Sequence, residues 1–113
     1  MITFHVRCRL RDGQSDEAER LIVDLVATVE RKETDAVFYA FFRSMSDPLE
    51  VVLVESYSSN EAFMAHNGSS YMVAFRERFT ELFDPSINEV TTLQGIAGFG
   101  RAWSSAREAC VVS

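Results

Sequence analysis

His66 is the residue of this 113-residue chain whose type best suits acid–base chemistry. It stands in NEAFMAHNGSSYMVAF, residues 60–75, directly before the run NGSS. An unperturbed imidazole has a pKa of about 6.5 and can serve as a general base near neutral pH. Its place at the predicted end of a short helix also suits a plainer role, in which a half-buried His66 interacts with the negative end of the helix dipole. Both interpretations stay open at this stage.

Glu55 is a second candidate, because it interrupts the apolar run of EVVLVESY, residues 50–57. A carboxylate that is buried in a strand needs a partner. Arg7 or His5, on a neighbouring first strand, could supply one. We therefore expect Glu55 to be buried in a structural ion pair, in preference to acting as a catalytic base.

Metal, nucleotide and nucleic-acid chemistry lack the residues that they need. Cys8 and Cys110 lie near opposite ends of the chain, and neither they nor the two histidines have metal-ligand spacing. We expect no metal and two free thiols in a reducing compartment. No glycine-rich nucleotide loop is present. The formal net charge of −6, without a basic cluster, argues against nucleic acid as a partner.

The chain also lacks membrane and export signals. No segment approaches the roughly 18 consecutive apolar residues of a membrane helix. The first ten residues, MITFHVRCRL, alternate like a strand and have no signal-peptide pattern. We expect a cytoplasmic protein without a membrane partner.

Seven elements are predicted to position the candidate residues. Strands are indicated by period-two alternation or by β-branched and aromatic enrichment, and helices by apolar spacing of three to four residues. The predicted strands are residues 2–10, 37–45, 50–57 and 87–99. The first predicted helix begins at a Ser15 cap and ends near Lys32. The second begins at the S-x-x-E box of residues 58–61 and ends at Asn67-Gly68 in a left-handed cap. The third begins at Ser69 or Ser70 and ends before Asp84-Pro85.

This order predicts an α+β fold of the ferredoxin-like split βαβ type. The expected sheet has four antiparallel strands, with the first and third strands in the middle and the helices on one face. Residues 1–99 form the one expected domain. Residues 100–113 form a tail that is either disordered or crosses to a partner subunit.

The chain resembles the antibiotic biosynthesis monooxygenase domain family over residues 1–97. The resemblance rests on VLVESYSSNEAFMAH, with its apolar strand, glutamate, aromatic residue, capped helix and histidine, and on SSYMVAFRERFTEL after it. It implies a homodimer in which two sheets pack face to face as a closed α+β barrel. The residues support a dimer independently, because VFYAFF must place aromatic side chains on the sheet face without helices, and an exposed apolar face of that kind usually marks an interface.

The resemblance also implies a pocket between the sheet and the helices. Val6 on the first strand would line it, together with Tyr57 and Phe63, which match pocket positions of members that oxidise polyketide phenols. His66 would be the base or hydrogen-bond partner, and Arg76, if it turns inward, would stabilise the substrate anion.

Haem degradation, known in other members, is not expected. Those members use an asparagine, a tryptophan and a haem-ligating histidine where this chain has Val6, His66 and Arg76, so none of the three positions matches. We expect no cofactor.

The function expected from these residues is cofactor-independent oxidation of a small electron-rich aromatic, such as a quinol or a polyketide phenol. A base removes a phenolic proton, and the substrate anion itself reduces dioxygen. The alternative is a dimeric small-molecule binding or stress-response protein without turnover. A third interpretation is an isomerase or lyase that uses the same pocket with His66 as base.

Overall fold

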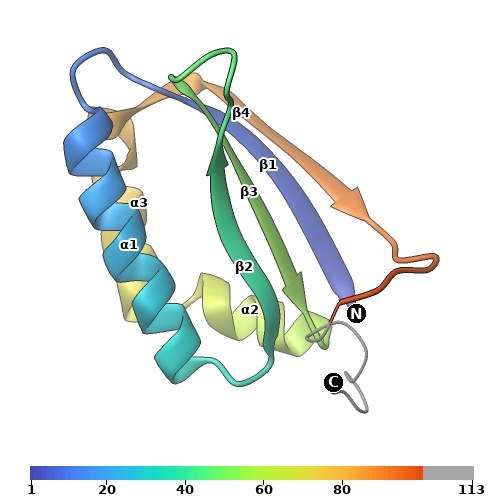
Figure 1. Ribbon diagram of the computed structural model, residues 1–113. Coiled ribbons are helices and arrows are strands. Elements are labelled where there is room, and N and C mark those ends of the chain that lie inside the picture. The colour runs from blue at the N-terminus through green and yellow to red at the C-terminus, as the bar shows by residue number, and fades with distance from the viewer. Residues whose placement is uncertain (101–113) are drawn as a thin grey trace.

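The structure, a computed structural model, describes residues 1–100, and Figure 1 shows how their elements are arranged. The strands are β1 (Ile2–Leu10), β2 (Ala36–Arg43), β3 (Glu50–Tyr57) and β4 (Phe83–Leu93). The helices are α1 (Ser15–Lys32), α2 (Asn60–Asn67) and α3 (Ser70–Leu82). The predicted tail lies outside the described residues from position 101 onwards.

The four strands form one antiparallel sheet in the order β2-β3-β1-β4. The first and third strands lie in the middle, and the helices lie to one side of the sheet (Figure 1). The predicted fold class, an α+β ferredoxin-like split βαβ fold, is confirmed.

The strand register decides which side chains face the helices. Phe4 lies opposite Glu55, and Cys8 lies opposite Val51, on one side of the sheet. Because side chains alternate along a strand, Arg7 and His5 point to the other side. The core between sheet and helices contains Cys8, Leu10, Ala18, Leu25, Val29, Val51, Phe75, Leu82 and Phe83. Burial in this core raises the pKa of the Cys8 thiol to about 11, so the thiol is structural rather than reactive.

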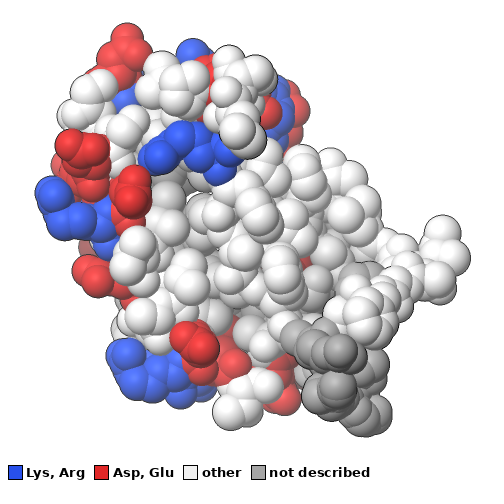
Figure 2. All heavy atoms as spheres, in the orientation of Figure 1, with Lys and Arg blue, Asp and Glu red and all other residues white. Residues whose placement is uncertain are grey.

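The other side of the sheet, which we call the open face, carries aromatic side chains, as the sequence predicted. Phe38 and Phe42 of β2 are 44% and 51% exposed there. Figure 2 shows a broad uncharged area in the middle of the molecule, with acidic and basic residues interspersed along the α1 side. Arg7 lies on the same face and forms a two-pronged hydrogen bond, of 3.0 and 2.8 Å, with the carboxylate of Glu89 on β4.

The last strand begins and ends earlier than the predicted range of 87–99. It starts at Phe83, immediately after α3, and ends at Leu93. Phe83 pairs with Leu10, and its ring stacks on Phe79 with the centroids 4.6 Å apart, so packing holds it in the sheet. Pro85 is tolerated inside this strand because β4 is at the edge of the sheet, where a missing donor costs no ladder bond.

Two helix ends also differ from the prediction. Ser15 is the first residue of α1 rather than its cap, and Gln14 precedes it without a side-chain cap. Gly68 ends α2 with φ of −90°, so the left-handed conformation expected at Asn67-Gly68 is not used. Ser69 caps α3 as predicted and accepts from the Met72 N–H. The cap of α2 is Ser59, which accepts from the Ala62 N–H, rather than the Ser58 that the S-x-x-E box of residues 58–61 implied.

Leu82 provides a test of this packing, because it is fully buried where α3 passes into β4. Leu82→Ala should lower the free energy of unfolding by about 2–5 kcal/mol, since it removes buried methyl groups and leaves a cavity. Urea unfolding measures the change. Met45→Ala, in the exposed turn between β2 and β3, is the control and should unfold with the wild type. Equal midpoints for Leu82→Ala and wild type would contradict the described core.

Candidate functional site

His66 lies on the last turn of α2, and its ring points into the molecule rather than along the helix axis. The residue is only 2% exposed. His66 is therefore buried and not half-buried, although it does lie in the last turn of α2 as the helix-end interpretation expected. What holds the ring is a set of side chains from α1, α3, β2 and β3, which we call the His66 cluster: Glu33, Tyr39, Glu55, Tyr57 and Tyr71.

Glu33 anchors one side of the imidazole. It is the residue that follows α1, and its backbone N–H closes that helix on the Val29 carbonyl at 2.8 Å. Its Oε2 lies 2.8 Å from His66 Nδ1, and the Tyr71 hydroxyl donates to the same oxygen. Hydrogen bonds that involve a carboxylate are stronger than neutral ones, so this pair of bonds ties the end of α1 to both other helices.

Glu55 approaches the opposite side of the imidazole. Its Oε1 lies 3.9 Å from His66 Nε2, which is too long for a hydrogen bond. The same oxygen accepts a bond of 2.5 Å from the Tyr57 hydroxyl. Burial raises the pKa of Glu55, although the Tyr57 hydrogen bond and the nearby imidazole act in the opposite direction.

The expected partner of Glu55 was wrong. Arg7 and His5 were predicted to pair with it, but the register places both on the open face, and Arg7 bonds Glu89 instead. Glu55 is buried, as predicted, at 8% exposure, but its hydrogen-bond partner is Tyr57.

Aromatic rings enclose the imidazole. Tyr39 and Tyr57 both lie with their ring centroids 5.2 Å from that of His66. Phe63 packs behind Tyr57 at 5.5 Å and against Phe4 at 4.4 Å. Burial raises the pKa of both tyrosines in contact with His66, so their hydroxyls remain protonated and neutral.

His66 Nε2 is a buried side-chain nitrogen with no hydrogen-bond partner among residues 1–100. A buried polar atom without a partner costs about 1–3 kcal/mol. Native proteins retain few such atoms, and an unsatisfied group of this kind calls for a functional or structural reason. Nε2 is therefore the atom of this cluster that has unused hydrogen-bonding capacity.

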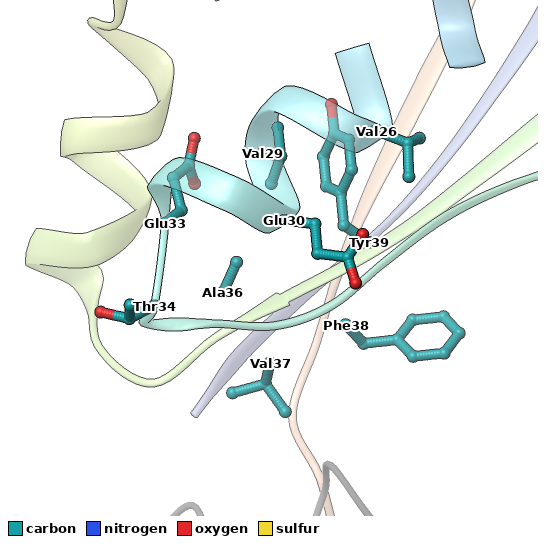
Figure 3. Close-up of a pocket in the computed structure, with 9 residues that line it drawn as sticks. All are labelled: Val26, Val29, Glu30, Glu33, Thr34, Ala36, Val37, Phe38 and Tyr39. Carbon is teal, nitrogen blue, oxygen red and sulfur yellow. The ribbon is translucent and has the colours of Figure 1, made fainter. Parts of the chain in front are cut away.

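Two hollows lie beside the cluster. The smaller one, about 240 Å³, opens beside His66 on the Glu33 side; its lining is Lys32, Glu33, Thr34, Asp35, Ala36, Ala62, Ala65, His66 and Tyr71. The larger one, about 440 Å³, runs along the β2 edge without touching His66. In Figure 3 Tyr39 points toward α1 while Phe38 points away from it, so this larger hollow is a gap between helix and edge strand. Of the His66 cluster, Glu33, His66 and Tyr71 line the smaller hollow, whereas Glu55 and Tyr57 line neither of the two.

The residues predicted for the site are only partly brought together. Tyr57 lies in the cluster, and Phe63 packs against its outer ring. Val6 lies on the same side of the sheet, farther along β1, opposite Leu53. Arg76 is exposed rather than turned inward, because its guanidinium bonds the Asn67 side-chain oxygen at 3.3 Å and its carbonyl at 2.7 Å.

Three members of the cluster were missed from the sequence. Glu33 and Tyr71 lie 33 and 5 positions from His66, and Tyr39 comes from a strand whose aromatic residues predicted a sheet and a dimer interface but no site. Glu33 offered one signal: it is an acidic residue at a helix C-terminus, where a negative charge is unfavourable unless a partner compensates it.

Residues 1–78 match the family model of the antibiotic biosynthesis monooxygenases, and the chain belongs to this family. Among curated proteins, none matches the chain significantly. Solved structures, in contrast, do match this chain. Rv0793 of Mycobacterium tuberculosis has a TM-score of 0.77 and 23% identity, over 88% of this chain and 98% of its own.

Two further structures are similar to this chain. PA3566 of Pseudomonas aeruginosa has a TM-score of 0.75 and 19% identity, over 85% of this chain and 94% of its own. A structure of an antibiotic biosynthesis monooxygenase has a TM-score of 0.76 and 16% identity, over 86% of this chain and all of its own. At these identities the likeness establishes the fold.

Metal and membrane features can also be stated for the described part of the chain. Within residues 1–100, no group of three or more histidine, cysteine or acidic side chains is placed to hold a metal ion. None of the helices described here is long and apolar enough to cross a membrane.

The raised pKa of Glu55 predicts a pH dependence of stability. The folded state keeps this proton at pH values where the unfolded chain, with the ordinary value of 4.5, has lost it. The contribution of Glu55 to stability is therefore fully present below about pH 4.5 and is lost as the pH rises through the folded-state pKa. Glu55→Gln keeps an acceptor for Tyr57 and removes the titration, so the variant should gain stability relative to wild type as the pH rises.

Urea unfolding of both proteins from roughly pH 4 to pH 8 measures this difference. Glu61→Gln, which removes an exposed carboxylate from α2, is the control. A difference between wild type and Glu55→Gln that is constant with pH, or that turns against the variant, would contradict the described burial of Glu55.

Proposed function

We propose that this protein is a cofactor-independent monooxygenase that oxidises a small electron-rich aromatic, a quinol or a polyketide phenol, with dioxygen. The observation that carries the proposal is the His66 cluster, in which a carboxylate fixes a buried imidazole whose second nitrogen lacks a partner. The fold of the family and the family's name support the reaction class. The proposal places the protein in the cytoplasm, in keeping with the free, buried Cys8.

The reaction requires a base, a hydrogen-bond donor and an apolar surface from the protein. His66 accepts the phenolic proton, which creates an electron-rich anion that can reduce dioxygen. The Tyr57 hydroxyl, which donates to Glu55 Oε1 in the closed cluster, would turn its proton to the substrate anion, and aromatic side chains such as Phe63 provide an apolar surface for the ring of the substrate. Val6 would extend that surface along β1.

One observation favours the second candidate, a dimeric small-molecule binding or stress-response protein without turnover. Tyr57 is fully buried and His66 nearly so, which means that a substrate reaches Nε2 only after α2 or Phe63 moves. The same cluster, left closed, would simply be a polar part of the core.

Oxygen uptake with a panel of hydroquinones and anthrones separates the two candidates. The wild type should consume dioxygen with at least one compound, and His66→Gln should lower turnover by about a hundredfold or more, because it removes the base. Met64→Gln is the control, since Met64 is on the same helix and 61% exposed. No uptake with any compound, together with measurable binding of one, would establish the binding protein instead.

The protein is further proposed to act as a homodimer joined through the open faces of two sheets. The support is the exposure of Phe38 and Phe42 on a sheet face that none of the helices described within residues 1–100 covers. Stable interfaces of this kind bury on the order of 2,000 Å² or more, so dissociation should require denaturant.

Light scattering should give a mass of twice 12.8 kDa for the wild type. Phe42→Glu should give a monomer, because it places a charge in the centre of the interface. Val23→Glu, at a position 58% exposed on α1, should leave the mass unchanged. A wild-type monomer at micromolar concentration would rule the dimer out.

A further inference from the structure

The two nitrogens of the His66 ring have different surroundings. Nδ1 lies 2.8 Å from the Glu33 carboxylate, whereas Nε2 is buried without a hydrogen bond among residues 1–100 and faces Glu55 Oε1 at 3.9 Å. A neutral imidazole carries one ring proton, and the partner of one nitrogen decides where that proton sits. The neighbours of the ring therefore determine which nitrogen is basic.

Glu33 is built to be an acceptor. An ionised carboxylate has no proton to donate, so a partner at hydrogen-bond distance must donate to it. The Tyr71 hydroxyl bonds the same oxygen, and burial together with this bond raises the pKa of Tyr71, which keeps the hydroxyl a donor. The Lys32 ammonium lies over the Tyr71 ring, 5.7 Å from its centroid, and so packs against the residue that bonds Glu33.

We infer that Glu33, held by Tyr71, is a positioning residue that fixes His66 as the Nδ1–H tautomer, so that Nε2 is the atom which accepts the substrate proton. The inference rests on the proposed function for the reaction, although the tautomer itself does not depend on turnover. In the proton transfer the substrate O–H bond breaks, a new N–H bond forms at Nε2, and the resulting imidazolium is stabilised by the Glu33 carboxylate.

This assignment restricts the substrate. Among residues 1–100 the charged groups within 4 Å of the ring nitrogens are carboxyl groups, Glu33 on α1 and Glu55 on β3. The groups facing the ring from β2 and β3 are the neutral tyrosines Tyr39 and Tyr57, and Tyr71 of α3 lies beyond Glu33. Because Nε2 accepts a proton, the substrate is a phenol or quinol that arrives with its hydroxyl protonated, and this hydroxyl approaches from the Glu55–Tyr57 side, which Nε2 faces.

Nitrogen NMR of the full chain tests the tautomer directly. The chain has only two histidines, His5 and His66, so histidine-selective ¹⁵N labelling gives two ring systems. His66 should show a protonated Nδ1 and an unprotonated Nε2 at the pH of turnover. A ring with its proton on Nε2, or with both nitrogens protonated at that pH, would overturn the inference whether or not any compound is turned over.

Glu33→Gln supplies the second readout, because a neutral amide can donate as well as accept and no longer fixes the tautomer. The variant should populate the Nε2–H form and lower kcat by about a hundredfold, with KM close to the wild-type value. Glu30→Gln, an exposed carboxylate one turn earlier, is the matched control and should leave both spectrum and kcat unchanged.

Thermal unfolding separates loss of function from loss of fold in these variants. Where Glu33→Gln proves too unstable, Tyr71→Phe removes one bond to Glu33 and should shift the tautomer and kcat in the same direction by a smaller factor. If the spectrum and kcat of the folded variants match those of wild type, the positioning role of Glu33 is excluded. If no compound supports turnover but the tautomer follows Glu33, the proposed reaction fails while the assignment of the ring proton stands.

Discussion

The hydrogen bond between Glu33 and His66 joins the parts of the molecule that must meet to make a site. Glu33 directly follows α1, His66 lies in the last turn of α2, and Tyr71 of α3 bonds the same carboxylate, so one carboxylate oxygen connects all three helices. The strands supply the other wall, because the register of β3 turns Glu55 and Tyr57 toward the imidazole. If the carboxylate were removed, the imidazole would lose the only hydrogen bond that the structure gives it among residues 1–100.

Local pattern was sufficient to predict most of the fold. Alternation in residues 2–10 and the capped helices define elements whose order permits few topologies, and the strand order follows from that. The prediction failed where packing overrides local preference. Asp84-Pro85 suggested that the last strand would begin only after the proline. Stacking of Phe83 on Phe79 and pairing of Phe83 with Leu10 instead bring the chain into the sheet directly after α3.

The site was harder to predict than the fold, since its bonds join residues that are distant in the sequence. His66 and Tyr57 were found from residue type and family likeness, but nothing local connects Glu33 to either. The partner of Glu55 was missed because it depends on which face each side chain takes, and a shift of one residue in register exchanges the two faces. Arg76 lies at the surface because its guanidinium donates a hydrogen bond to the Asn67 carbonyl, one of the carbonyls at the end of α2 that lack a partner within the helix.

We propose that the His66 cluster receives an aromatic ligand and is not merely a polar part of the core. Titration of the histidine-labelled protein with a single-ring hydroquinone under anaerobic conditions, followed by ¹⁵N NMR, tests this proposal. The ¹⁵N chemical shift of His66 Nε2 should change as the site is saturated, while the chemical shifts of the His5 ring, on the open face, should not change. A His66 ring that remains unchanged at saturating hydroquinone would contradict it.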